Sequence, residues 1–289
     1  MIGEINHPAV VQLHARLMNH PNRFIRRNAI IAAGRSGHRD LVPILIQLLA
    51  SRESSSMARK ALQEYKDRIL GTLMDILKDP GENIEIRRQL PLILEHIPSQ
   101  NTVNVLIDAL SDEDGLLRFR SIKALNRLRI GEQTFDFDVD AISSQIEIES
   151  EKVLWYKHSL SVLYSNKESR DLLAQLLKDK INQGRERAFR LLGLVLPPTA
   201  AHAAYKAIVE ENRAKKANAV EYLDNVLSPQ LKKWVMQLVE TRKITFSDRM
   251  PDILGIFTRS KDRILRECAL DAARKNGWPD YSIAGGLET

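Results

Sequence analysis

Apolar residues recur along most of the chain at the spacing of one face of an α-helix. Segments such as LVPILIQLLA (41–50) and TVNVLIDALSD (102–112) place apolar side chains three or four residues apart, which predicts amphipathic helices. Turn-forming residues separate these segments, as in HPN (20–22) and DPGEN (79–83). The pattern therefore predicts an all-helical chain whose helices are joined by short turns.

One nine-residue pattern repeats along the chain: apolar, basic, two variable, small, two variable, small, apolar. It is clearest as IRRNAIIAA (25–33) and LRFRSIKAL (117–125), and eight copies can be aligned. Most copies start 29 to 32 residues after the previous one, with a second apolar-periodic segment between them. Each repeat is therefore predicted to be a helical hairpin, and such hairpins bury their apolar faces by stacking into a solenoid. The fifth positions of the copies are Ala29, Ala61, Leu90, Ser121, Ser159, Ala188, Ala219 and Ala269.

Two steps between copies are longer, 38 residues after Ser121 and 50 residues after Ala219. The first contains GEQTFDFDVDAISSQIEIESE (131–151), which has seven acidic residues and no basic one. We interpret it as a longer connection whose aromatic side chains cover the edge of the stack, followed by a solvated acidic helix. A docking loop for a basic partner is the alternative. The second step is expected to contain an extra helix, since a long structureless loop is uncommon in a compact fold.

The motifs IRxxAxxAAG (25–34) and LRxxSxxAL (117–125), each preceded by an acidic residue or Asn in the turn, resemble HEAT repeats, especially the short bacterial kind. The resemblance covers nearly the whole chain. It implies a right-handed α-solenoid of about eight HEAT-like helical hairpins. It also implies a single domain over 1–289, with irregular connections at 130–145 and 240–250.

A narrower resemblance runs from about Leu117 to Glu240. Phrases such as WYKHSLSVL and RAFRLLGLVLPP look like the HEAT region of bacterial proteins related to ATP/ADP carriers of the major-facilitator type. Many of those proteins also carry a cyclic-nucleotide-binding domain. The resemblance implies a regulatory module associated with a carrier-like membrane protein. It carries over no transport or nucleotide-binding residue, because those motifs lie outside this sequence.

The composition fits a folded chain that does not itself span a membrane. It is 44% hydrophobic and 28% charged, so a sizeable core is expected. No apolar run reaches the ~18 residues that a membrane span needs, and the N-terminus lacks the pattern of a signal peptide. We expect a cytoplasmic location, including the inner face of a membrane if the chain is part of a larger protein. A single cysteine, Cys268, excludes an intrachain disulfide.

A basic residue follows the first position of the pattern in six copies, at the edge of the predicted apolar face. These residues are Arg26, Arg87, Arg118, Arg185, Lys216 and Arg266. An arginine at such an edge can bond the turn carbonyls or carboxylates of a neighbouring hairpin with its rigid fork of donors. We therefore predict a role in packing for this position, and we call these residues the edge cations.

The third, seventh and tenth positions point away from the apolar face and should form an exposed strip on the concave surface. Charges along this strip are sorted by sign. Solvent exposure explains charge there but not the sorting, so we expect an acidic segment of a protein partner to dock on the basic part. The basic residues are Arg27, Arg59, Lys66, Arg88, Lys123 and Lys157, and the acidic end contains Glu221, Asp224, Glu267 and Asp271.

Sequence motifs for catalysis are absent. The chain has no P-loop, no GxGxxG after a strand, no nucleophile elbow, no CxxC and no HExxH, so we expect no enzyme activity, no cofactor and no metal. The leading hypothesis is a non-catalytic protein-interaction scaffold. The alternative is a nucleic-acid-binding HEAT-like protein of the DNA-repair type. The net charge of +6 is low for that function. A chromophore lyase or similar small-molecule modifier is a third class, and no residue points to it.

Overall fold

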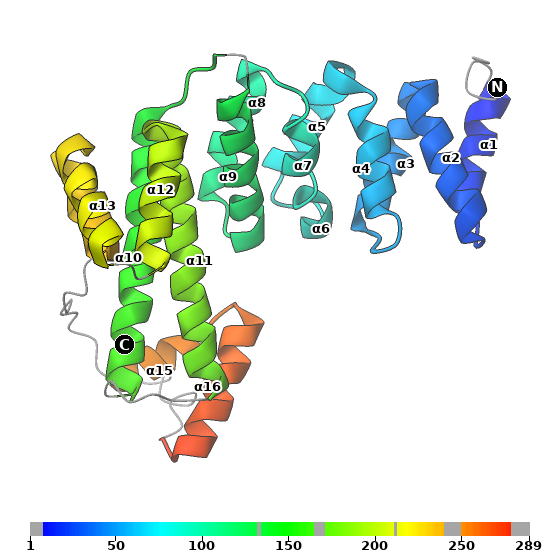
Figure 1. Ribbon diagram of the computed structural model, residues 1–289. Coiled ribbons are helices and arrows are strands. Elements are labelled where there is room, and N and C mark those ends of the chain that lie inside the picture. Colours follow the sequence, from blue (N-terminus) through cyan, green and yellow to red (C-terminus); the bar gives the residue numbers. More distant parts are fainter. Residues whose placement is uncertain (1–7, 132–133, 165–170, 211–212, 240–249, 279–289) are drawn as a thin grey trace, which may run out of the picture. The chain divides into compact units, whose positions relative to one another are not determined.

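The computed structural model describes residues 8–131, 134–164, 171–210, 213–239 and 250–278 (Figure 1). Every regular element in these ranges is a helix, which confirms the all-helical, repeat-built fold class. The chain divides into two compact units, Met1–Ile142 and Ser143–Thr289. That all repeats form one continuous solenoid stays a prediction.

The first unit is a stack of helical hairpins (Figure 1). The second helix of each hairpin packs against the second helix of the next, α2 against α4, α4 against α7 and α7 against α9. The hairpin prediction is therefore confirmed for residues 8–131. The elements are α1 (Pro8–Met18), α2 (Arg23–Ser36), η2 (Arg39–Leu41), α3 (Val42–Gln47), η3 (Leu48–Ala50), α4 (Ser55–Gln63), η4 (Lys66–Ile69), α5 (Leu70–Lys78), α6 (Ile84–Arg87), α7 (Pro91–Leu94), α8 (Gln100–Asp108), η5 (Ala109–Ser111) and α9 (Gly115–Ile130).

Asn and Asp residues of the turns determine where the second helices begin. The side chain of Asn22 accepts hydrogen bonds from the first amides of α2, and Asp114 accepts one from Leu117 at the start of α9. Such caps satisfy amides that have no partner inside the helix. In the third hairpin the second helix is divided into α6 and α7 at Pro91, which cannot donate a backbone hydrogen bond.

The fifth position of the repeat lies in the core in every copy. All eight of these side chains are buried, from Ala29 in α2 to Ala269 in α16. Small residues at this position let neighbouring helices approach closely. At the close approach of α2 and α4, for example, a Cβ added at Gly34 would lie 2.7 Å from the Cα of Ala61.

Three of the edge cations bond the turn that precedes their own helix. Each arginine donates from Nη1 to a carbonyl oxygen six residues earlier in the chain. The bonds run from Arg26 to His20 (3.0 Å), from Arg118 to Asp112 (2.7 Å) and from Arg266 to Ser260 (3.0 Å). The donor and the acceptor are six residues apart in all three repeats. The arginine therefore has the same role in each: its hydrogen bond links the second helix to the turn before it.

Two edge cations also reach the next hairpin. Arg26 forms an ion pair with Glu53, in the turn before α4. Arg87 is buried, donates two hydrogen bonds to the carbonyl of Leu77 and pairs with Asp112 at 2.6 Å. The predicted packing role is therefore confirmed for Arg26, Arg87, Arg118 and Arg266.

The second unit is built from longer helices. These are α10 (Val139–Tyr164), which begins just before the boundary between the units, α11 (Leu172–Val195), α12 (Pro198–Val209), α13 (Arg213–Val226), α14 (Pro229–Val239), α15 (Met250–Thr258) and α16 (Arg263–Asn276). Helix α11 packs against α12 and α16, and its buried residues share a core with the end of α10. The expected extra helix of the 50-residue step is present, since both α14 and α15 lie within it. Residues 240–249 of that step lie outside the described part of the chain.

The hairpin prediction is wrong for the repeat whose fifth position is Ala188. Its pattern (184–192) and the apolar-periodic segment before it (171–181) lie in one continuous helix, α11. The reason lies at Gly184, which is buried in the middle of α11. A Cβ there would lie 2.4 Å from Cγ2 of Val153 on α10. This glycine therefore allows two long helices to touch and does not form a turn.

The acidic connection after α9 is followed by a helix, as expected, but that helix is not solvated throughout, because Glu149 is buried and pairs with Arg187 at 2.8 Å. Whether the connection docks a basic partner stays a prediction. Residues 134–138 are extended, and the helix predicted after them begins at Val139. Phe137 is half-buried beneath the guanidinium of Arg129, 5.2 Å from its ring centroid. The side chain of Gln100 bonds both the N–H and the carbonyl of Asp136. These contacts attach the connection to the last hairpin of the first unit.

Replacing Gly184 by Ala tests the close contact between α10 and α11. We expect Gly184→Ala to lower the free energy of unfolding by about 1–3 kcal/mol, because overpacking outweighs the gain in helix propensity. The measurement is chemical denaturation followed by circular dichroism. In a Val153→Ala background the same change should cost much less, because Cγ2 is gone. Equal losses in both backgrounds would show that the contact does not set the helix spacing.

Candidate functional site

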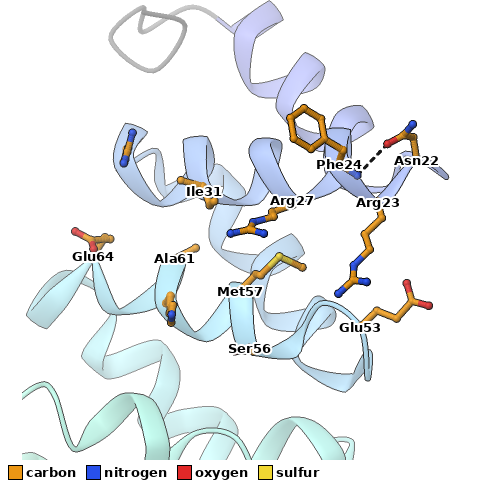
Figure 2. Close-up of a pocket in the computed structure, with 12 residues that line it drawn as sticks. Asn22, Arg23, Phe24, Arg27, Ile31, Glu53, Ser56, Met57, Ala61 and Glu64 are labelled. Carbon is orange, nitrogen blue, oxygen red and sulfur yellow. Dashed lines mark hydrogen bonds between the residues drawn. The ribbon is translucent and has the colours of Figure 1, made fainter.

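A groove of about 1000 Å³ runs between α2 and α4 in the first unit (Figure 2). One side is formed by α2 and its cap, and the other by α4 and the turn before it. Every lining residue therefore comes from the first two hairpins. They are Asn22, Arg23, Phe24, Arg27, Ile31, Arg35, Glu53, Ser56, Met57, Lys60, Ala61 and Glu64.

The groove exposes apolar side chains. Phe24 is 73% exposed and Ile31 is 37% exposed, while Met57 on the opposite wall is half-buried. The ring of Phe24 and the side chains of Ile31 and Met57 are shown in Figure 2. An exposed aromatic residue in a groove with further apolar residues is typical of an interaction site rather than of ordinary surface.

Helical periodicity brings the α2 residues together. Phe24, Arg27, Ile31 and Arg35 follow one another at intervals of three or four residues, so they share one face of α2. The face begins where Asn22 caps the helix, with its side chain accepting a 2.9 Å hydrogen bond from the Phe24 amide.

Positive charge dominates the rim of the groove. Four basic residues line it, Arg23, Arg27, Arg35 and Lys60, against the acidic Glu53 and Glu64. The carboxylate of Glu53 is engaged by Arg26. Within the part of the chain that the structure describes, none of the four basic side chains forms an ion pair. Their charges are therefore available to a ligand.

Of the predicted basic strip, only Arg27 lies in this groove. Lys66 follows the end of α4 in the left-handed conformation, with φ +53, and begins η4. It does not continue the face of α4, so the helical spacing that placed it on the strip is wrong there. Arg59 is half-buried on α4. Lys123 is half-buried, with its ammonium 5.6 Å from the ring centroid of Phe119.

Arg88 is committed to packing. It bonds Glu85 on its own helix and both carboxylate oxygens of Asp114, at 3.0 and 2.6 Å. Its placement on the strip as a cation open to a partner is therefore corrected. Burial acts to raise the pKa of Asp114, but the bonds from Arg88 and from the Leu117 amide outweigh it and hold that pKa below its usual value.

Three arginines of successive hairpins, Arg59 on α4, Arg88 directly after α6 and Arg120 on α9, lie close enough for their charges to interact. Arg120 donates a 2.7 Å hydrogen bond to the carbonyl of Arg88. Burial lowers the pKa of Arg120, and the nearby charges of Arg59 and Arg88 lower it further. Sequence reasoning missed Arg120, because it stands one position beyond the predicted strip.

The remaining predicted residues belong to the second unit. Lys157 is half-buried on α10. The acidic end is partly neutralised, since Asp224 pairs with Lys232 and Asp271 with Lys275. Glu221 and Glu267 are exposed on α13 and α16. Whether any residue of the strip binds a partner stays a prediction.

Sequence reasoning also missed most of the groove. Arg23, Arg35 and Lys60 stand at positions of the repeat that were not assigned to the strip. The available signal was Phe24, an aromatic residue two positions after the helix cap Asn22, where it stays exposed.

The described residues show neither a metal centre nor a membrane span. No group of three or more His, Cys, Asp or Glu side chains among them is arranged to hold a metal ion. No helix in the described ranges combines the length and the apolarity needed to cross a membrane.

Comparison with known proteins supports the repeat assignment at one end of the chain. A family model for HEAT repeats matches residues 1–66. This segment includes every residue that lines the groove. No curated protein matches the chain.

Two crystal structures of engineered proteins are similar to the chain at low identity. One is 15% identical and has a TM-score of 0.31, with 79% of this chain and 94% of the other covered. The second is 14% identical and has a TM-score of 0.34, with 92% and 67% covered. At these values neither structure bears on the arrangement described above.

The Arg88–Asp114 pair predicts a pH-dependent loss of stability. Asp114→Asn keeps a capping side chain but removes the charge, so we expect about 1–2 kcal/mol less free energy of unfolding at neutral pH. Because the pKa of Asp114 is lowered in the folded protein, its contribution is present above the usual pKa of about 4 and is lost as the pH falls through the lowered value. Urea denaturation over a pH series should therefore show the two proteins converging in acid.

Asp108→Asn is the matched control for this change. Asp108 also pairs with a cation, Lys78, but both side chains are more than half exposed. We expect a change within about 0.5 kcal/mol at any pH. An equal loss in the two variants would contradict the assignment of Arg88 to packing.

Proposed function

We propose that the chain is a non-catalytic docking module whose α2–α4 groove binds an acidic amphipathic segment of a protein partner. The observation that carries the proposal is the exposed Phe24 in a groove edged by four unpaired basic side chains. Apolar area and positive charge occur together there, and an acidic amphipathic helix presents the complementary combination.

The chemistry of the groove matches the helix-in-groove mode of recognition. Apolar residues on one side of the partner helix would cover Phe24, Ile31 and Met57. Carboxylates along its flanks would meet Arg23, Arg27 and Lys60. Burial of the apolar residues supplies most of the affinity, while the charges fix the orientation and speed the encounter.

The match to HEAT repeats supports a scaffold function in general, since such repeats commonly mediate protein–protein interaction. The resemblance of residues 117–240 to the HEAT regions of carrier-like proteins supports a narrower form of the proposal. In that form the partner is a membrane carrier and the module works at the inner face of the membrane. The groove itself lies outside that resemblance, so the two parts of the proposal can fail independently.

The nucleic-acid alternative loses support from the structure of the basic strip. A strip of free cations would track a phosphate backbone, but Arg88 is bound to two carboxylates and Lys66 leaves the helix face. The unpaired basic side chains of the groove lie beside the exposed Phe24 and Ile31, which favours a protein ligand.

Fluorescence anisotropy with two labelled helical peptides tests the proposal. One peptide carries Leu on one face and Glu on its flanks, and in the other every Glu is replaced by Lys. We expect the Glu peptide alone to bind, and Arg27→Glu to weaken its binding by about tenfold or more. Arg27 is exposed, so folding should be unaffected.

Arg16→Glu provides the control, because it makes the same charge change at an exposed residue of α1 that does not line the groove. It should leave the affinity unchanged. Equal binding of the two peptides, or equal affinities of the two variants, would count against the groove. Binding of labelled duplex DNA that persists at near-physiological salt and is lost in Arg27→Glu would favour the nucleic-acid function instead.

A further inference from the structure

The acidic connection and the first half of α10 expose a surface with the chemistry that the groove requires. No basic residue occurs in the sequence from 131 to 151. Two apolar side chains are exposed among the carboxylates, Val139 by 49% and Ile148 by 38%. The carboxylates that are exposed belong to Asp136, Asp138, Asp140 and Glu151. We call these six residues the acidic face.

The helical part of the acidic face lies on one side of α10. Asp140, Ile148 and Glu151 fall within about 80° of one another around the helix. Ile142 and Ile146 point the other way and are fully buried. The acidic face is therefore presented to a ligand without any change in the packing of α10.

The acidic face and the groove are similar in length. Glu151 stands 11 positions after Asp140, and Arg35 stands 11 positions after Phe24 on the groove wall. At a helical rise of 1.5 Å per residue, each span is about 16 Å. A helix that presents the acidic face can therefore lie along α2 over the whole groove.

The fold of the first unit keeps the acidic connection away from the groove of its own chain. Gln100 on α8 bonds the N–H and the carbonyl of Asp136, and α8 packs against α9. The groove lies between α2 and α4, and α7 packs between α4 and α9 in the stack (Figure 1). The connection of one chain is therefore available to the groove of another.

We propose that the groove of one chain binds the acidic face of a second copy of the same chain. This inference rests on the proposed function, because it names the partner of the same groove. Ile148 of one copy would cover Phe24 and Ile31 of the other, and the flanking carboxylates would meet Arg23 and Arg27. Each copy carries both surfaces, so the copies can pair reciprocally or associate head to tail.

Analytical ultracentrifugation of the full chain tests the inference. At low salt we expect the average mass to rise above the monomer mass of 32.9 kDa as the protein concentration increases. Added salt should return the chain toward the monomer, because it screens the opposite charges of the two surfaces. Wild-type protein that stays monomeric at low salt at every concentration would overturn the proposal.

Two charge reversals, one on each surface, identify the contact. Arg27→Glu in the groove and Glu151→Lys on the acidic face should each weaken self-association by about tenfold or more. Both residues are exposed, so folding should be unaffected. An equimolar mixture of the two variants should associate again, because each supplies the surface that the other lacks.

Glu267→Lys is the matched control, since it makes the same charge change at an exposed residue of α16 outside the acidic face. It should self-associate as the wild type does. Equal self-association of Glu151→Lys and Glu267→Lys, or a mixture of Arg27→Glu and Glu151→Lys that stays monomeric, would contradict the inference.

The Glu peptide separates a failure of this inference from a failure of the proposed function. Glu151→Lys keeps the groove intact and should bind that peptide as Glu267→Lys does. A monomeric wild type that binds the peptide would exclude the second copy as partner and leave the groove as a docking site. A monomeric wild type that does not bind the peptide would overturn both proposals.

Discussion

In three of the repeats, a hydrogen bond between an edge arginine and the preceding turn fixes the second helix against that turn. The carbonyls of a turn need hydrogen-bond donors, either from water or from a side chain. Arg26, Arg118 and Arg266 each solve this with one hydrogen bond to the residue six positions earlier. The rigid guanidinium reaches the carbonyl while the fifth-position residue, three further along, lies in the core.

Because the edge arginine is held by this hydrogen bond, only neighbouring basic side chains are left to bind a partner. Where Arg26 is held by its turn and by Glu53, the adjacent Arg27 is left on the rim of the groove with no carboxylate in bonding distance among the described residues. Two consecutive arginines thus have different tasks because successive residues of a helix point about 100° apart. Where the turn itself is lost, as in the continuous α11, the edge arginine has nothing to brace. There the buried Nε of Arg185 has no hydrogen-bond acceptor among the described residues.

The sequence predicted the features that depend on local periodicity. The eight core positions and the hairpins of residues 8–131 follow from helical spacing and turn residues within one repeat. The departures come from contacts between helices. Gly184 resembles a turn residue, but its role depends on Val153, which is 31 residues away. Arg88 resembles a free surface cation until Asp114 of the next hairpin is placed beside it. The groove was missed for the same reason, since two helices form it and neither shows it alone.

The most direct test of this account compares the stabilities of two adjacent single variants, Arg26→Met and Arg27→Met, by chemical denaturation. Methionine keeps much of the apolar stem and removes the charge and the donors. We expect Arg26→Met to lose about 1–3 kcal/mol of unfolding free energy, because two turn carbonyls and Glu53 lose their donor. Arg27→Met should stay within about 0.5 kcal/mol of the wild type. Equal stabilities of the two variants would contradict the claim that the edge arginine holds the repeat together.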